Sequence, residues 1–219
     1  MALFIILGFW QLDRAEQKRA LEQAFADTGR YVTVDAETVY EPYQPLTASG
    51  RYLLKREFLL DNVILDGRLG YYLVTPFEYE SGKPLLLVNR GWAPKTAGSE
   101  PAGISAAAPD EGVTTVRGRA GQLPRVGIRA GEAFAYSAGE WPRIANWPTI
   151  DELSASLGRD VLPFVLLADP EPGTTLIRRW QPQQAGPMRH IGYAFQWFAL
   201  ALAVVVVAVV VYRSQRMRQ

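Results

Sequence analysis

A chain of 219 residues with a formal net charge of +1 has room for one domain and its membrane anchors, but hardly for two domains. The absence of cysteine excludes disulfides, thiolate-held iron–sulfur clusters, covalent haem attachment and thiol catalysis. Three methionines and one histidine do not suffice for a copper site, and the near-zero charge gives no sign of a nucleic-acid partner.

The first twelve residues are apolar, and charges begin only at Asp13. As a helix this stretch covers roughly 18 Å, whereas a bilayer core is about 30 Å thick. It also lacks the positive charge and the cleavage site of a signal peptide. We therefore expect residues 1–12 to be an incomplete first transmembrane helix whose start is missing, with Trp10 and Gln11 at the membrane interface. A juxtamembrane helix should follow and end at Gly29.

The middle of the chain has the residue pattern of β-structure. Strands are expected near residues 51–60, 71–77, 85–90, 113–119 and 161–167. Asp66–Gly67 predicts a tight turn between two of them, and Pro163 indicates that the last strand lies at an edge or contains a bulge. Thr149 and Glu152 form a capping box, which predicts a short helix up to Leu157.

Several strands with few helices predict a small, mostly antiparallel β domain, either a barrel or a sandwich. We expect it to occupy residues 13–189, together with the juxtamembrane helix, as an extramembrane domain. Within it, Arg90-Gly91-Trp92 closes a strand, and Trp92 is expected to be a core aromatic that follows a bulge.

The C-terminal stretch 190–212 opens with the only histidine of the chain and is uncharged from Ile191 to Tyr212. It is long enough to cross a bilayer as a helix. Arginines flank both ends in equal number, and the immediate flank at Arg213 favours a cytoplasmic tail over residues 213–219. The overall fold class is therefore a membrane-anchored α+β protein, with its β domain on the outer side between two transmembrane helices.

His190 has two interpretations. On a helix it shares one face with Tyr193, Ala194 and Trp197, and imidazole is the usual axial ligand of haem iron. Arg189 could then reach a haem propionate. The alternative is that histidine, tyrosine and tryptophan lie at the membrane interface because of their mixed polarity.

The other candidate residues do not assemble into a catalytic site. No Gly-x-Ser-x-Gly elbow accompanies the single histidine, so we do not expect an enzyme. Gln196 lies shallow in the second span, where it either hydrogen-bonds a partner helix or faces the lipid headgroups.

Four motifs occur in order along the chain: residues 7–14 (LGFWQLDR) with Lys18, residues 70–76 (GYYLVTP), residues 88–94 (VNRGWAP) and residues 190–198 (HIGYAFQWF). Together they resemble motifs of the Surfeit locus protein family, in its cytochrome c oxidase assembly branch. The residues that this resemblance marks as structural motif positions are Trp10, Gln11, Arg14, Asn89, Arg90, Gly91, Trp92 and Gln196. The chain departs from the family pattern in its short first span.

The resemblance implies a multi-pass inner-membrane protein whose β domain faces the periplasm, or the intermembrane space in mitochondria. It implies a non-catalytic factor that handles haem a and assists its insertion into oxidase subunit one, with haem a synthase as a further partner. The haem ligand proposed for the family matches His190, so that Arg189, Tyr193 and Trp197 would surround the haem. The alternative is a scaffold that stabilises an oxidase intermediate through Trp10, Gln196 and the strand motif without binding haem.

Overall fold

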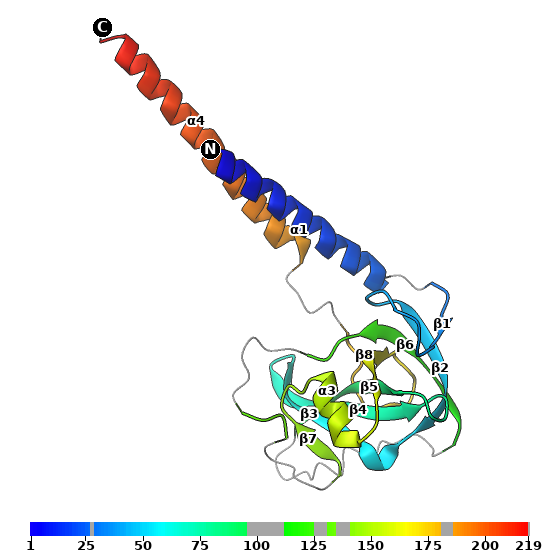
Figure 1. Cartoon of the computed structure of the whole chain (residues 1–219). Coiled ribbons are helices and arrows are strands. Elements are labelled where there is room, and N and C mark those ends of the chain that lie inside the picture. Colours follow the sequence, from blue (N-terminus) through cyan, green and yellow to red (C-terminus); the bar gives the residue numbers. More distant parts are fainter. Residues whose placement is uncertain (27–28, 96–111, 125–130, 135–140, 181–185, 219) are drawn as a thin grey trace. The chain divides into compact units, whose positions relative to one another are not determined.

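The protein is described here by a computed structural model that covers residues 1–26, 29–95, 112–124, 131–134, 141–180 and 186–218. It divides into two compact units. Met1–Ala26 and Pro182–Gln219 form the first unit, which we call the helical pair. Asp27–Gln181 forms the second unit, which we call the β domain (Figure 1).

Among the described residues, the β domain contains one sheet of eight strands in the order β1-β2-β6-β8-β5-β4-β3-β7. The strands are β1 (Val32–Thr33), β2 (Pro45–Tyr52), β3 (Phe58–Leu65), β4 (Arg68–Glu78), β5 (Leu85–Pro94), β6 (Thr114–Gly121), β7 (Arg143–Ala145) and β8 (Val161–Ala168), with a 3-10 turn, η1, at Leu54–Arg56. The end of β2 also pairs with β4, through Arg51–Glu78 and Tyr52–Phe77. This extra pairing closes β2, β6, β8, β5 and β4 into a barrel, one of the two architectures expected (Figure 1).

Local sequence signals account for the turns and the short helix. Asp66 and Gly67 both have positive φ angles, of 50° and 73°, and join β3 to β4 as the expected tight hairpin turn. Helix α3 (Ile150–Leu157) begins with the expected capping box, in which Thr149 and Glu152 each accept a hydrogen bond from the other's backbone. It ends at Gly158, which adopts the left-handed conformation with φ 64°.

Strand β8 fits the expectation for Pro163. The strand lies between β5 and β6, but its pairing with β6 covers only Val165–Ala168, so the segment with Pro163 pairs with β5 alone among the described strands. Its parallel pairing with β5 passes from Leu85–Val161 to Leu87–Val165, which leaves Pro163 in an irregular stretch. The bulge alternative is therefore correct, because the strand is irregular where proline cannot donate a ladder hydrogen bond.

Most of the buried side chains in the core of the β domain are apolar. Helix α3 inserts Leu153, which has no exposed surface, into a cluster with Phe58, Leu87 and Val165. Each such side chain contributes roughly 1.5–3 kcal/mol when it leaves water. The barrel is therefore a rigid support for the polar residues that β4 and β5 carry.

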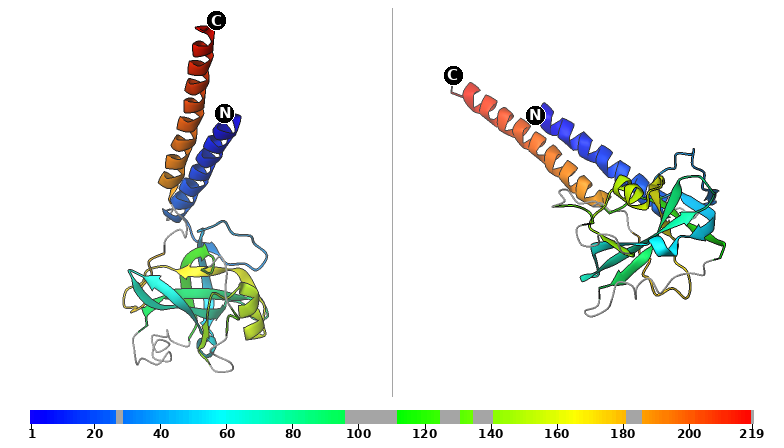
Figure 2. Two further views of the ribbon diagram at one scale, coloured as in Figure 1. Left: turned by 90° about the vertical axis from the view of Figure 1, so that its left-hand side faces the viewer. Right: turned by 60° about the horizontal axis from the view of Figure 1, so that its bottom comes forward.

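The helical pair consists of α1 (Ala2–Ala26) and α4 (Pro187–Arg216), which run antiparallel and side by side in every view (Figures 1 and 2). Helix α4 continues beyond the N-terminal end of α1 (Figure 2). It is the one described helix that is long and apolar enough to cross a membrane. Helix α1 runs without a break past Asp13, as the juxtamembrane expectation required, and a membrane span over residues 1–12 stays a prediction.

Candidate functional site

The contact between α1 and α4 is built from small residues. Gly8, Gln11 and Ala15 are the buried residues of α1, and Ala194 and Ala201 are those of α4. On α1 they are three and four residues apart, and on α4 they are seven apart. This spacing averages about 3.5 residues, which keeps one stripe of a helix, here called the seam, facing a neighbouring helix. A Cβ atom on Gly8 would lie 2.5 Å from the ring of Phe198. The two backbones therefore approach closely, as in the packing of membrane helices.

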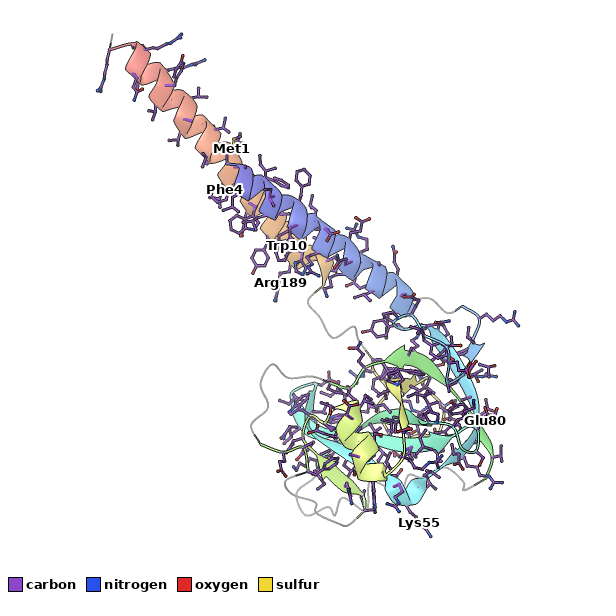
Figure 3. The ribbon with its side chains drawn as sticks, in the orientation of Figure 1. Met1, Phe4, Trp10, Lys55, Glu80 and Arg189 are labelled. Carbon is purple, nitrogen blue, oxygen red and sulfur yellow. The ribbon has the colours of Figure 1, made fainter. Side chains whose placement is uncertain are left out.

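Aromatic rings fill the space beside this seam. Phe4 stacks on Trp197 with their centroids 5.8 Å apart, and Phe9 meets Phe198 edge to face at 5.4 Å. Figure 3 shows Phe4 near the start of α1 and Trp10 farther along the same helix. The Trp197 ring is thus already in contact with a protein ring, about two helical turns along α4 from His190.

His190 forms the one polar side-chain contact across the helical pair that the described residues show. Its Nδ1 atom lies 2.8 Å from Oε1 of Gln11, a residue that is only 9% exposed. An amide oxygen accepts hydrogen bonds and cannot donate them, so with the amide in this orientation a neutral imidazole carries its proton on Nδ1. The Nε2 lone pair is then available to a metal, and the ring orientation is fixed by the second residue, as in many protein metal sites.

The remaining sequence candidates of the helical pair are exposed. Tyr193 is 45% exposed, and Arg189 and Gln196 are also exposed (Figure 3 labels Arg189). Trp10 is 48% exposed, and the guanidinium of Arg14 lies 5.6 Å from the centre of its ring. The structure therefore brings His190 and Gln11 together, packs Trp197 against Phe4 instead, and leaves the other candidates on the surface of the helices.

Sequence reasoning did not predict the partnership of Gln11 and His190, which are 179 positions apart. A signal was present. Gln11 interrupts an apolar stretch of α1 at helical spacing from Gly8 and Ala15, and a polar residue on a buried seam requires a hydrogen-bond partner.

The strand motif of β5 forms a bulge in the wall of the barrel. Leu73 pairs with Gly91 and Val74 with Asn89, so Arg90 is an extra residue in the ladder. Asn89 Oδ1 accepts a hydrogen bond of 3.2 Å from the backbone N–H of Gly91, whose φ is 135°. Any side chain at Gly91 would meet Leu176 Cβ at 2.8 Å, in addition to the backbone strain.

Trp92 is buried, in agreement with the expectation of a core aromatic after a bulge. It is 1% exposed, and its Nε1 donates a hydrogen bond of 3.0 Å to the carbonyl oxygen of Val63. Gly70 on β4 makes room for the indole, because a Cβ atom there would lie 2.4 Å from the ring. Glycine and tryptophan from two different motifs therefore pack as one unit.

Arg90 forms a buried ion pair that was not expected from the sequence. Its Nη1 donates to Oε1 of Glu57 at 2.8 Å, and the two side chains are 4% and 0% exposed. Thr75 Oγ1 donates to the same oxygen at 2.8 Å. Burial lowers the pKa of the Arg90 guanidinium, whereas the Glu57 carboxylate raises it. Each charge thus depends on its partner inside a low-dielectric core.

The donor set of the chain limits which metal group it can hold. No cluster of three His, Asp or Glu side chains occurs in the described ranges. A porphyrin supplies four nitrogen ligands of its own, so haem iron needs only one further ligand from the protein. His190 with a free Nε2 atom meets this requirement.

Two comparisons with known proteins agree on the family. The SURF1 family model matches residues 1–202. A SURF1-like protein of Rickettsia bellii is 26% identical over 222 residues, which cover 97% of this chain and 87% of the relative. A SURF1-like protein of Rickettsia felis is 25% identical, with 97% and 93% covered, and one of Monosiga brevicollis is 24% identical, with 89% and 78% covered. Because the family model spans nearly the whole chain, this protein belongs to the SURF1 family.

Proposed function

We propose that this protein is a non-catalytic, membrane-anchored assembly factor for cytochrome c oxidase that holds haem a through His190 during insertion into subunit one. Membership of the SURF1 family, generally known for oxidase assembly, supports the assembly role. The hydrogen bond of 2.8 Å between Gln11 and His190 is the observation that carries the haem part of the proposal.

The residues divide the work as follows. Gln11 Oε1 would accept a hydrogen bond from Nδ1 and hold the ring in place, so that Nε2 of the neutral ring would be the ligand for haem iron. Bound haem a would contribute its iron as the acceptor of this lone pair and its propionates as anionic groups. Arg189, exposed beside His190, carries a guanidinium that can pair with a carboxylate.

The attachment would be reversible. The chain has no cysteine, so haem cannot be held through thioether bonds. His190 would supply the iron with a single ligand from this site. Reversible binding through one ligand suits a protein that passes its haem to another chain, here oxidase subunit one, after receiving it from haem a synthase.

The proposed location is the inner membrane, with the β domain on the periplasmic side. Helix α4 supports this, since it can span a bilayer and carries Arg213 and Arg216 in its last turn. Basic residues favour the cytoplasmic side. His190, near the first residue of the helix, would then lie at the outer membrane boundary.

The experiment compares His190→Ala with Gln196→Leu in cells that also produce haem a synthase. Gln196 is the matched control because it lies on the same helix and is exposed. His190→Ala should reach the membrane in normal amount but lose the Soret band of co-purified haem, whereas Gln196→Leu should keep it. Full retention of the band in His190→Ala would remove His190 as the ligand.

The scaffold role is the second candidate, because Trp10 and Gln196 are exposed and free to meet a partner helix. If the wild-type protein purifies without haem, and Gln196→Leu lowers the yield of assembled oxidase while His190→Ala does not, the scaffold becomes the better account. A polar contact of this kind between membrane helices contributes about 0.6–2 kcal/mol.

A further inference from the structure

The β domain contains a cleft of about 880 Å³ that the proposed haem function does not use. It is lined by residues 114–117 at the start of β6, by residues 168–175 from the end of β8 onward, and by Tyr31, Tyr52, Arg90 and Arg178. The volume falls within the roughly 300–1,000 Å³ of ordinary ligand sites. We therefore considered which hydrogen-bonding groups and charges face this space.

One wall is an open strand edge. Strand β6 pairs with β2 from Thr114 to Arg119, but with β8 only from Gly118 onward. The last contact with the chain after β8 is a hydrogen bond of 3.0 Å from the N–H of Asp169 to the carbonyl oxygen of Arg117. Pro170 and Pro172 follow and have no N–H to donate. The pairing therefore stops where the cleft begins.

The free backbone groups of this edge belong to Thr115. In an antiparallel ladder, residues two apart turn their N–H and C=O groups to the same neighbour. Because the Arg117 carbonyl faces Asp169, the N–H and C=O of Thr115 face the cleft. In the part of the chain that the structure describes, no strand pairs with this side of Thr115. The edge is thus a template for one more strand.

The opposite side of the cleft presents a fixed positive charge. Arg178 donates from Nε to the carbonyl oxygen of Arg90 at 2.7 Å and from Nη1 to that of Asp169 at 2.6 Å. Glu171 lies 3.3 Å from the same guanidinium but is 70% exposed, whereas Arg178 is 10% exposed. A guanidinium held by two carbonyl oxygens is preorganised for a carboxylate.

Two tyrosines add hydrogen-bonding groups without adding charge. Burial raises the pKa of Tyr52 to about 12, so its hydroxyl remains protonated at neutral pH. Tyr31 donates a hydrogen bond of 2.6 Å to the carboxylate of Asp169, so this acidic side chain of the cleft already has a hydrogen-bond partner. Arg90 is already paired with Glu57, so the positive charges that an anionic group would meet in the cleft are those of Arg117 and Arg178, beside Asp169 and Glu171.

We propose that this cleft binds an extended, acidic peptide segment of a partner protein, which pairs with β6 at Thr115 and places a carboxylate on Arg178. Addition of a strand to an open sheet edge is a common mode of peptide recognition. The four residues of the edge correspond to about 13 Å of extended chain at 3.3 Å per residue. The site lies within the β domain and does not depend on haem binding at His190.

The test uses the full chain in lipid nanodiscs and selects binders from a displayed library of short random peptides. The informative variant is Thr115→Pro, which removes the cleft-facing N–H and no hydrogen bond to β2. The matched control is Thr115→Val, because both variants lose the side-chain contact of 2.8 Å with Ser49 but the valine keeps the N–H. Selected peptides should bind Thr115→Pro about tenfold more weakly or worse, and Thr115→Val nearly as well as the wild type.

Two further measurements do not require the proline variant to fold. Hydrogen exchange of the Thr115 amide in the wild-type protein should slow when a selected peptide is added. An acidic peptide should bind Arg178→Gln more weakly, whereas its version with Asn or Gln in place of the acid should bind wild type and variant alike.

Three results would overturn the proposal: no peptide enriched by selection, equal binding to Thr115→Pro and Thr115→Val, or unchanged exchange at Thr115 with peptide bound. Displacement of the peptide by acetate at equal concentration would show instead a site for small carboxylates. Each outcome is independent of the Soret band that tests the haem proposal.

Discussion

The β domain and the helical pair use their motif residues in opposite ways. In the β domain, Asn89, Arg90 and Trp92 are buried and their polar groups bond to other parts of the same domain. In the helical pair, Gln11 and His190 form the one polar side-chain contact between the two helices that the described residues show, and Trp10, Arg189 and Gln196 are exposed. The motif of the β domain therefore stabilises the fold, whereas the motifs of the helical pair leave several side chains exposed to other molecules.

Trp92→Ala should give the largest effect, because it empties a fully enclosed site in the core. We expect the free energy of unfolding of the β domain to fall by about 3–5 kcal/mol. The same change at the exposed Trp10 should shift it by less than about 0.5 kcal/mol. Denaturant unfolding, followed by the signal of the β domain, measures both. An unchanged unfolding curve for Trp92→Ala, with oxidase assembly lost, would mean that the motif contacts a partner.

Arg90→Met should destabilise the β domain by about 3 kcal/mol, because it leaves the Glu57 carboxylate buried without its counter-charge. The double variant Arg90→Met with Glu57→Leu should recover much of this loss, since it removes both charges together. Equilibrium unfolding of the two single variants and the double variant gives the coupling energy. Additive effects would show that the ion pair does not act as a unit.

Gly8→Leu should separate the two helices of the helical pair and leave the β domain unaffected. The new side chain would start from a Cβ that is 2.5 Å from the Phe198 ring, a clash of the kind that costs about 1–3 kcal/mol. Gly192→Leu is the matched control, because no atom lies within 4 Å of its Cβ position. Spin-label distances between α1 and α4 should lengthen only in Gly8→Leu. An unchanged distance would contradict the close packing of the seam.

The smallest effect should be a pH dependence that involves Tyr52. Burial raises its pKa from 10.0 in the unfolded chain to about 12 in the folded protein, so the folded state keeps the proton in this interval. The free energy of unfolding should therefore fall as pH rises from 10 to 12. Tyr52→Phe should reduce this slope in urea titrations at alkaline pH. An equal slope in the variant would assign the alkaline loss to other groups.

The features that could be predicted from the sequence are those set by neighbouring residues. The Asp66–Gly67 turn, the Thr149 capping box and the burial of Trp92 each follow from local chemistry. The unpredicted features join distant positions. Closure of the barrel depends on pairing of β2 with β4, and the partner of Arg90 lies 33 positions away.

The candidate site shows the same limit. The sequence indicated His190 and Trp197 on one helix face, because helical periodicity is a local property. It could not indicate Gln11 as the residue that orients the imidazole, since only the packing of α1 against α4 brings them together. Pro163 similarly indicated an edge or a bulge, and only the structure shows that β6 stops pairing with β8 at Val165 and that the pairing with β5 is irregular there.

The most direct test of the central claim is the nitrogen spectrum of the full chain labelled with 15N-histidine, recorded under conditions in which the ring is neutral. Because the chain contains one histidine, the two ring signals belong to His190 alone. We predict a protonated Nδ1 and an unprotonated Nε2, with this preference lost in Gln11→Leu. A proton on Nε2 in the wild-type protein would contradict the account. The nitrogen proposed as the iron ligand would then have no lone pair to offer, and Nδ1 would have no proton to donate to Gln11.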